Sequence, residues 1–371
     1  MSASLFESTL DPRARLGYSP AELCERGLIP DRLARHGMRM LIKQRLLDEA
    51  IDDGELRSRR FNTLLDGLRA GPIAIETVTA NQQHYEVPAE FFHLHLGPCL
   101  KYSCCLYPHG TETLAQAEQA MLELYAERAQ LADGQRILDL GCGWGSLSLW
   151  LAERYPHVQI VGLSNSHSQR EFIECQAVER GLTNLRIVTG DIVDFDFAAR
   201  EIPADFDRVL SIEMLEHMKN YGLLFKKLAA WMKPDAKLFA HVFAHRLLAY
   251  HFEVKDRHDW MTQYFFQGGT MPSESLFSYF QDDLKLARNW WVSGRHYQRT
   301  ANHWLTGMDR AKAQILPWLE VTYGPRDALL WFRRWRMFYM AVAELFGYAG
   351  GNEWGVAHYL FERRNVTRMG G

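Results

Sequence analysis

Apolar and polar positions alternate along the middle of the chain in a way that predicts strands separated by helices. Five short apolar runs have the length and composition of buried strands, and the segments between them carry apolar residues at the 3.6-residue period of helices. The predicted strands span residues 136–140, 158–163, 185–190, 206–211 and 237–243. This alternation predicts an α/β fold with a doubly wound, Rossmann-like sheet. Ligands of such sheets bind over the carboxyl ends of the strands.

The two flanks of this middle segment show different patterns. The N-terminal flank carries apolar residues at helix spacing, most clearly over residues 38–47 and 61–68. After about residue 244 the alternation gives way to helix-like, aromatic segments, although the apolar run 354–361 suits a late strand of the sheet. We therefore expect three parts. They are a helical N-terminal extension (1–80), a Rossmann-like core with its connector (81–243), and a helical, aromatic substrate cap with the closing strand or strands of the core sheet (244–371).

Composition narrows the class of protein. Hydrophobic residues make up 47% of the 371 residues and charged residues 23%, as in ordinary globular proteins. The net charge of -3 gives no field that would gather nucleic acid phosphates, so we expect no nucleic acid partner. The first thirteen residues carry acids and no uninterrupted apolar run, which predicts a cytoplasmic protein. The six cysteines show no repeated metal or disulfide spacing, so we expect reduced thiols.

A glycine-rich turn follows the first predicted strand. Gly141, Gly143 and Gly145 alternate with other residues, and a helix-like pattern begins directly after them. Glycines at such a turn let backbone N–H groups approach a ligand at the positive end of a helix. A dinucleotide site would need the spacing G-x-G-x-x-G and an acid at the end of the second strand, but residues 163–166 contain no carboxylate. The turn instead resembles motif I of the Rossmann-like S-adenosylmethionine methyltransferases.

Two other polar segments are predicted to reach the same edge of the sheet. Residues 190–192 follow the third strand, and the Asp191 carboxylate can accept a hydrogen bond from an adenine amino group. Taken alone, an aspartate that caps the next turn explains that residue equally well. The connector before the first strand carries polar side chains at residues 102–105, which could reach a cofactor.

The segment after the fourth predicted strand carries the candidates for acid–base chemistry. Glu213, Glu216 and His217 stand at helical offsets of three and four, so all three could face one pocket. Two neighbouring carboxylates repel each other when both are ionised, so one of them can hold a proton near neutral pH, where histidine also titrates. This set is suited to general-base catalysis. The alternative is a solvent-exposed helix start, where the helix dipole favours acidic residues.

A metal site is the less favoured interpretation of the remaining histidines and cysteines. His241 and His245 stand four residues apart, but their segment is predicted as a strand that leads out of the sheet. The pair is therefore not held one helical turn apart, and the sequence contains no His-Glu-x-x-His motif. Cys104 and Cys105 could suggest a thiol nucleophile, but roles in the core or in positioning the backbone are favoured. We expect no metal.

Several segments together carry a family resemblance that extends from about Met38 to the end of the chain. They are residues 81–88, 101–105, 138–149, 211–221, 260–273 and 341–348. In these segments the chain resembles the cyclopropane fatty acid synthase-like S-adenosylmethionine-dependent methyltransferases, and most of all their coclaurine N-methyltransferase group. The resemblance implies the class I methyltransferase fold, S-adenosylmethionine as cofactor and S-adenosylhomocysteine as product.

The resemblance also implies which residues contact the cofactor. Asn165 and Gln169 would take the place of the ribose-binding carboxylate that the second strand lacks. The complete implied set is Tyr102, Ser103, Gly141, Gly143, Asn165, Gln169, Asp191 and Ile192.

Two activities within the family imply different roles for the remaining site residues. Lipid-cyclopropanating members hold a bicarbonate base with residues that match Cys104, Glu216, His241 and Tyr297 of this chain. Those members usually have a small residue in place of Glu213, and they insert residues before the Asn-Tyr pair that here follows closely at 220–221. The amine N-methyltransferases share both features with this chain. Their precedent implies that Glu213 and His217 bind and deprotonate the amine, with Glu216 in support.

We therefore expect transfer of a methyl group from S-adenosylmethionine to the nitrogen of a small aromatic amine, such as a benzylic or tetrahydroisoquinoline-type compound. Aromatic side chains, among them Tyr264 and Phe265, could stabilise the cationic nitrogen. The alternative is methylation or cyclopropanation of unsaturated phospholipid chains, and only this alternative involves bicarbonate and membrane contact. A cofactor-binding scaffold without activity is disfavoured by the base cluster. The N-terminal helices show no catalytic pattern and could serve a homodimer.

Overall fold

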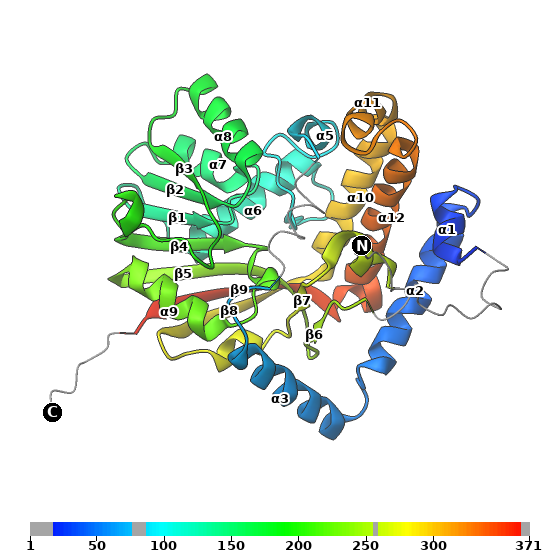
Figure 1. Ribbon diagram of the computed structural model, residues 1–371, viewed down its shortest axis with the longest axis horizontal. Coiled ribbons are helices and arrows are strands. Elements are labelled where there is room, and N and C mark those ends of the chain that lie inside the picture. Colours follow the sequence, from blue (N-terminus) through cyan, green and yellow to red (C-terminus); the bar gives the residue numbers. More distant parts are fainter. Residues whose placement is uncertain (1–17, 76–86, 255–258, 365–371) are drawn as a thin grey trace, which may run out of the picture.

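A seven-stranded sheet forms the centre of the protein (Figure 1). The structure, a computed structural model, describes residues 18–75, 87–254 and 259–364. The order of the strands is β3-β2-β1-β4-β5-β9-β8, with β1 to β5 parallel and β9 antiparallel to both of its neighbours. This arrangement confirms the predicted Rossmann-like α/β fold. The strands are β1 (Arg136–Leu140), β2 (Gln159–Ser164), β3 (Leu185–Thr189), β4 (Phe206–Ile212), β5 (Met232–His245), β8 (Leu284–Ser293) and β9 (Trp354–Arg363).

The predicted strands and the observed strands agree in the core and differ in the cap. The five predicted core strands and the late strand are all present, although β5 is longer than predicted at both ends. The expectation of helix-like segments after residue 244 was wrong for β8. Because β8 is the edge strand of the sheet, most of its residues are half-buried or exposed, and Lys285, Arg288 and Asn289 interrupt its apolar pattern. The period-2 pattern of a half-buried strand is consequently absent.

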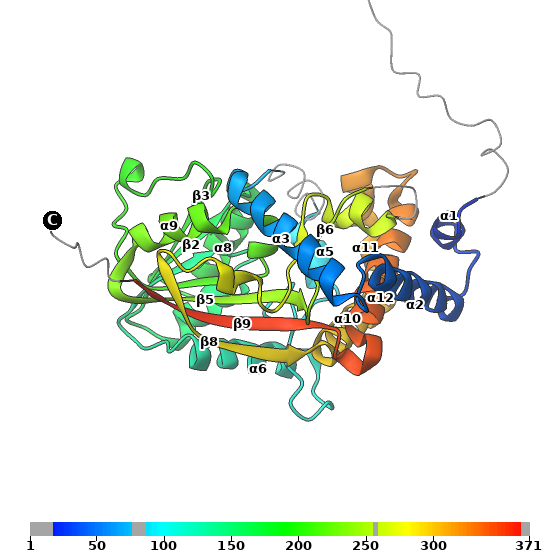
Figure 2. The ribbon, with the colours of Figure 1, turned by 90° about the horizontal axis from the view of Figure 1, so that it is seen from below.

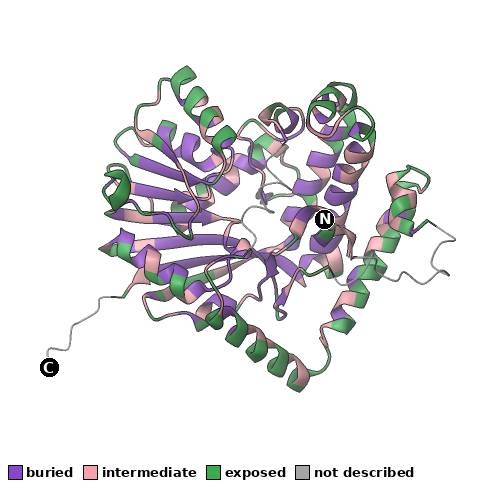
Figure 3. Ribbon diagram, viewed as in Figure 1, coloured by how far each residue is buried: buried purple, intermediate pink, exposed green. Residues whose placement is uncertain are grey.

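Alternate residues of each strand enter two apolar cores on opposite faces of the sheet, as the pleat requires. Ile137 and Phe239 pack in the core that includes α6 (Leu114–Arg128) and α7 (Ser146–Arg154). Leu138 packs in the other core, with α9 (Tyr221–Trp231) and α3 (Gly54–Ala70). Figure 2 shows α6 below the sheet and α3 and α9 above it, and Figure 3 shows the strands mostly buried between these layers. The helix α8 (His167–Glu179) follows β2.

The N-terminal helices and the cap lie at the carboxyl end of the sheet (Figure 1). Arg35 and Arg39 form ion pairs of 2.8 and 2.6 Å with the largely buried carboxylate of Glu344, and Arg35 also donates to Asn302. These contacts attach the N-terminal extension to the cap. The helices concerned are α1 (Pro20–Glu25), α2 (Asp31–Asp48), α5 (Ala89–His93), α10 (Gly294–Arg310), α11 (Lys312–Tyr323) and α12 (Ala328–Gly347), with a two-stranded ribbon of β6 (Tyr250–His251) and β7 (Thr270–Met271).

Gly294 begins α10 at the place where β8, β9 and α12 meet, and one methyl group added there should strongly lower the stability of the protein. A Cβ atom at Gly294 would lie 2.1 Å from the carbonyl oxygen of Trp354 and 2.2 Å from that of Phe346. Because backbone atoms must move to accommodate it, we expect Gly294→Ala to lower the free energy of unfolding by about 2 kcal/mol or more. Denaturant unfolding followed by circular dichroism measures the change.

Gly37 provides the matched control because it lies on the exposed side of α2, and no described atom outside the local helix backbone lies within 4 Å of the added Cβ. We expect Gly37→Ala to raise stability by roughly 0.5–1 kcal/mol through helix propensity. Equal stability of the two variants would contradict the packing described for Gly294.

Candidate active site

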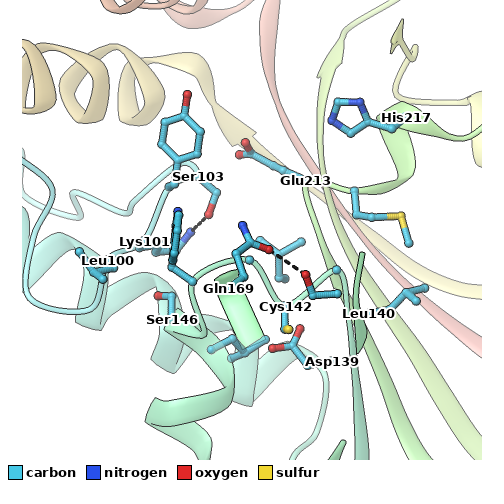
Figure 4. Close-up of a pocket in the computed structure, with 18 of the residues that line it drawn as sticks. Leu100, Lys101, Ser103, Asp139, Leu140, Cys142, Ser146, Gln169, Glu213 and His217 are labelled. Atoms are coloured by element: carbon cyan, nitrogen blue, oxygen red, sulfur yellow. Dashed lines mark hydrogen bonds between the residues drawn. The ribbon is translucent and has the colours of Figure 1, made fainter. Parts of the chain in front are cut away.

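A pocket opens at the carboxyl ends of β1, β2 and β4 and is closed on its far side by the connector and the cap (Figure 4). It brings together the cofactor residues that the family resemblance implied. All eight line it: Tyr102, Ser103, Gly141, Gly143, Asn165, Gln169, Asp191 and Ile192. The pocket therefore agrees with the sheet-edge placement expected from the sequence.

The three glycines of the turn after β1 serve different purposes. All three have a left-handed backbone, with φ of +79° at Gly141, +53° at Gly143 and +80° at Gly145. A Cβ at Gly141 would meet Met214 Cγ at 2.8 Å, and one at Gly145 would meet Ile173 Cγ1 at 2.7 Å. A Cβ at Gly143 would meet no described atom within 4 Å, although Gly143 lines the pocket. Gly143 therefore keeps a wall of the pocket open for a ligand.

Polar groups of the pocket fit a ribose-bearing cofactor. Ser164 Oγ donates to Gln169 Oε1 over 2.8 Å, which orients the side-chain amide. The Nε2 of Gln169 is buried and has no hydrogen-bond partner among the described residues, so it is available as a donor to a hydroxyl group. The sequence suggested that Asp191 either caps a turn or contacts the adenine, and its position allows both. Its Oδ1 accepts the N–H of Val193 at 2.9 Å, and the residue lines the pocket.

Glu213 lies at the end of β4 and has an unusual backbone. Its φ of +48° is left-handed, a strained conformation for a residue with a long side chain. Its carboxylate accepts three hydrogen bonds. Oε1 accepts from the Cys104 N–H at 2.9 Å and lies 3.0 Å from His241 Nε2, and Oε2 accepts the Tyr297 hydroxyl at 2.6 Å. The strained turn thus directs a carboxylate into a set of donors at the wall of the pocket.

Burial and charge act on the Glu213 carboxylate in opposite directions. Burial raises its pKa, whereas the Lys101 ammonium and the hydrogen-bond donors favour the ionised form. Lys101 is itself buried, and its Nζ donates to the Ser103 hydroxyl and to the Cys104 carbonyl oxygen. Because burial has the larger effect, the pKa of Glu213 is raised. A carboxylate of this kind is a stronger base than one in water.

Glu216 does not face the pocket, contrary to the expectation of one helical face for all three candidates. The segment forms a single 3₁₀ turn, Leu215–His217, rather than an α-helix, because Glu213 leaves β4 with a left-handed backbone. Glu216 Oε1 accepts the Phe243 N–H at 2.7 Å, and the side chain lies outside the set of described pocket-lining residues. Burial and then the charge of Glu213 raise the pKa of Glu216 well above its ordinary value, which favours its protonated form relative to a carboxyl group in water.

His217 lines the pocket beside Glu213, as expected. Its ring lies parallel to that of Phe266, with the ring centres 6.2 Å apart. Burial, followed by the charge of Lys219, lowers its pKa to about 4. The imidazole is therefore neutral at pH 7. The sequence had led us to expect a histidine that titrates near neutrality, and burial accounts for the difference.

The other predicted pocket residues divide into three groups. Tyr297 lines the pocket, while Cys104 and His241 lie behind Glu213 and contact it through hydrogen bonds. Tyr264 and Phe265 lie outside the set of described residues that line it. Phe265 stacks on Phe338 at 4.4 Å, and the Tyr264 ring lies 3.9 Å from the Arg334 guanidinium. A π-helical turn, Thr262–Phe266, buries Phe265 in the core, leaves Tyr264 half-buried and places Phe266 at the pocket.

Several pocket residues had no signal in the sequence. They are the aromatic residues Phe243, Trp304 and Phe338. Aromatic residues are so frequent in this chain that their number does not indicate which ones face a ligand. In the part of the chain that the structure describes, no three His, Cys, Asp or Glu side chains gather in an arrangement that could hold a metal. Burial raises the pKa of the Cys104 thiol, so that this group is not an activated nucleophile.

The fold and the pocket define a class I S-adenosylmethionine-dependent methyltransferase. A family model described as mycolic acid cyclopropane synthetase matches residues 74–346. The chain is 40% identical to (S)-coclaurine N-methyltransferase of Thalictrum flavum subsp. glaucum over 344 residues, which cover 92% of this chain and 94% of that protein. It is 34% identical to pavine N-methyltransferase of the same organism over 343 residues, 92% and 95% of the two chains.

Solved structures agree with these relatives. A crystal structure of coclaurine N-methyltransferase bound to N-methylheliamine and S-adenosylhomocysteine shares 38% identity and a TM-score of 0.88, covering 92% of this chain and 98% of that chain. By sequence alone, a more distant relative is cyclopropane-fatty-acyl-phospholipid synthase of Escherichia coli (strain K12). It is 28% identical over 227 residues, which cover 60% of this chain and 54% of that protein. The chain belongs to the mycolic acid cyclopropane synthetase family of methyltransferases and, within it, to the coclaurine N-methyltransferase group.

The open space at Gly143 predicts how a side chain there would act on the cofactor. We expect Gly143→Val to weaken binding of S-adenosylhomocysteine at least about tenfold, because the side chain would occupy the wall that the cofactor approaches. Isothermal titration calorimetry measures the affinity.

Gly181 offers a control with the same backbone constraint. Its φ is +66°, no described atom lies within 4 Å of an added Cβ, and it follows α8 away from the pocket lining. Gly181→Val carries the same kind of backbone strain and should leave the affinity unchanged. Undiminished affinity in Gly143→Val would remove the glycine turn from the cofactor site.

Proposed function

We propose that this enzyme transfers the methyl group of S-adenosylmethionine to the nitrogen of a small aromatic amine of the benzylisoquinoline or tetrahydroisoquinoline type. The relatives that cover more than nine-tenths of the chain are named as N-methyltransferases. The aromatic side chains of Phe243, Phe266, Trp304 and Phe338 give the pocket an apolar wall suited to a fused-ring amine. Their π faces would also favour a cationic nitrogen.

The position of the Glu213 carboxylate carries this proposal. The family resemblance assigns a bicarbonate base in lipid-modifying members to residues that match Cys104, Glu216, His241 and Tyr297. In this chain Cys104, His241 and Tyr297 hydrogen-bond the Glu213 carboxylate, whereas Glu216 accepts the Phe243 N–H. A bicarbonate ion bound by these groups would have to displace a buried anion. The site therefore favours a built-in carboxylate base over a bound ion, and amine methylation over lipid cyclopropanation.

Glu213 and His217 would prepare the amine for reaction. A protonated amine has no lone pair, so a proton must pass from the ammonium group to the Glu213 carboxylate or to the neutral His217 ring. The same two residues would hold the nitrogen in line with the methyl carbon, and alignment supplies a large part of the rate. S-adenosylmethionine, when bound, supplies a methyl group on a cationic sulfur, which keeps the bonding electron pair when the new C–N bond forms. Glu216 acts as a positioning residue through the Phe243 N–H.

Cofactor contacts form the second part of the proposal. Gln169 Nε2 and Asn165 would bind the ribose hydroxyls, and Asp191 with Ile192 would bind the adenine. The remaining groups of this set, Tyr102, Ser103, Gly141 and Gly143, would contact the amino acid part and the sulfur. The buried, unpartnered Nε2 of Gln169 supports this assignment.

Features outside the pocket do not favour a membrane substrate. Residues 331–336 of α12 are all aromatic or basic, and two of the arginines in this segment form ion pairs with acids of the same chain. Arg334 pairs with Glu25 at 2.8 Å, and Arg336 pairs with Asp31 and Asp309. Within the described ranges, no helix combines the length and the apolar character needed to cross a bilayer. The lipid alternative rests on the retained bicarbonate-type residues and on the more distant likeness to cyclopropane synthases.

We also propose that the enzyme is cytoplasmic and forms a homodimer. The helix α2 supports the second point, because Leu33, Met40, Leu41 and Leu47 are all more than half exposed in the described chain. An apolar helix face of this kind is suited to contact with a second copy. Light scattering of the purified protein measures the mass, and a monomer at micromolar concentration would contradict the proposed dimer.

Substitution of Glu213 tests its role as base. We expect Glu213→Gln to lower turnover by about 10²–10⁴-fold with unchanged affinity for S-adenosylhomocysteine, because the amide cannot accept the amine's proton. His217→Ala should also lose turnover. Steady-state kinetics with a tetrahydroisoquinoline and calorimetry measure the two effects.

Glu353 provides the matched control, because it also pairs with a histidine of β5, His245, at 3.3 Å, but lies outside the described pocket lining. Glu353→Gln should retain native turnover. Near-native turnover of Glu213→Gln would remove this carboxylate from the mechanism.

The fate of a labelled methyl group tests the reaction itself. The protein is incubated with methyl-labelled S-adenosylmethionine and, separately, with a panel of aromatic amines or with vesicles of unsaturated phospholipid plus bicarbonate. We expect label in an amine product and none in lipid. Label only in the lipid would overturn the amine proposal, and label in neither would reject both activities for the compounds offered.

A further inference from the structure

A line of four side chains runs from the Glu213 carboxylate across one face of the sheet to the helix α6. Arg128 Nη1 lies 2.7 Å from His358 Nδ1, His358 Nε2 lies 2.9 Å from His241 Nδ1, and His241 Nε2 lies 3.0 Å from Glu213 Oε1. Both histidines are fully buried. The line begins on α6, crosses β9 and β5 and ends at the carboxyl end of β4.

The register of the sheet places these groups in one row. His241 on β5 is the direct partner of His358 on β9, and His358 is the direct partner of Trp290 on β8. Directly paired residues of antiparallel strands point to the same face, so the two imidazoles lie side by side, with ring centres 4.8 Å apart. The Arg128 guanidinium lies 5.0 Å from the Trp290 ring centre and closes the end of the row.

The donor at one end of this row fixes the direction of every hydrogen bond in it. A guanidinium can only donate, so His358 Nδ1 must accept and the proton of that ring must lie on Nε2. That proton is donated to His241 Nδ1, so His241 in turn carries its proton on Nε2 and donates it to Glu213 Oε1. The Tyr125 hydroxyl also lies 2.9 Å from His241 Nδ1, so it shares the one lone pair of that nitrogen with His358. A hydroxyl that donates there likewise requires His241 to carry its proton on Nε2.

The surroundings keep both rings in the neutral form that this direction requires. Burial lowers the pKa of His241 and of His358 well below the ordinary value, and the neighbouring charges of Lys101 and Arg128 act in the same sense. A doubly protonated imidazole would have no acceptor nitrogen, and the row would be interrupted. Two neutral imidazoles therefore link an arginine to a carboxylate through aligned hydrogen bonds.

We propose that Arg128 and His358 are positioning residues for the reaction, which act through His241 to hold the Glu213 carboxylate in its ionised, proton-accepting form. This proposal rests on the proposed role of Glu213 as the amine's base. Neither residue is among the described residues that line the pocket, so neither touches a substrate bound there. Their contribution is to fix the tautomer of His241, because an Nδ1-protonated ring would turn a lone pair toward the carboxylate and repel it.

Two substitutions of His358 separate hydrogen bonding from packing. His358→Gln retains an N–H donor for His241, whereas His358→Phe fills a similar volume without one. We expect His358→Phe and Arg128→Met to lower kcat about tenfold, the value of one hydrogen bond to a charged system, with little change in KM for S-adenosylmethionine. His358→Gln should recover most of the lost kcat. A purely structural role would instead make both His358 variants equally defective.

Arg246 provides the matched control for Arg128. Its guanidinium lies at the same distance, 5.0 Å, from the ring centre of the neighbouring Trp291, but it pairs with Glu274 and takes no part in the row. Arg246→Met should retain native kcat. Affinity for S-adenosylhomocysteine, measured by calorimetry, shows whether each variant still has a folded pocket.

Nitrogen NMR of the ring atoms tests the row without any assay of activity. In protein labelled with ¹⁵N-histidine, we expect His241 and His358 at pH 7.5 to be neutral rings with the proton on Nε2, each assigned by loss of its signals in the corresponding His→Gln variant. An Nδ1-protonated or doubly protonated ring at either position would overturn the proposal. Native kcat in both Arg128→Met and His358→Phe would also overturn it, while leaving the role of Glu213 itself intact.

Discussion

The buried carboxylate of Glu213, held by three donors from three different parts of the chain, is the interaction on which the site depends. A charge in this position is stable only when its hydrogen bonds are satisfied. Three hydrogen bonds meet this need. They come from the Cys104 N–H of the connector, the His241 ring of the core sheet and the Tyr297 hydroxyl of the cap. The geometry of the base is consequently determined by the packing of the cap and the connector on the core.

The end of β4 explains why this carboxylate faces the pocket at all. The left-handed backbone of Glu213 ends the strand, and its N–H donates to the His241 carbonyl oxygen at 2.8 Å. The chain then forms a 3₁₀ turn that directs His217 to the pocket and Glu216 into the core. Two acids three residues apart thus acquire different surroundings. The Glu213 carboxylate is held by fixed donors at the pocket, whereas burial and the charge of Glu213 raise the pKa of Glu216. Separation of neighbouring carboxyl groups by their surroundings is a common way to prepare a general base.

Much of the fold could be predicted from local patterns, and less of the site. The strands β1 to β5 and β9 are apolar runs of strand length, and Gly141 and Gly143 stand at the alternate spacing that resembles a cofactor-binding turn. The edge strand β8 has no such pattern, because half of its surface is exposed. The position of Glu216 could not be predicted from helical offsets, since it depends on one backbone angle at Glu213. His358 had no signal, because its importance arises from sheet register across more than a hundred residues of sequence.

The proposed mechanism requires that the amine nitrogen binds at the Glu213 carboxylate. A crystal structure of the enzyme with S-adenosylhomocysteine and an N-methylated tetrahydroisoquinoline tests this most directly. We predict that the nitrogen lies within about 3.2 Å of a Glu213 carboxylate oxygen, or is joined to it by one ordered water. A nitrogen bound at another wall of the pocket, with the aromatic rings of the ligand packed against Glu213, would contradict the account.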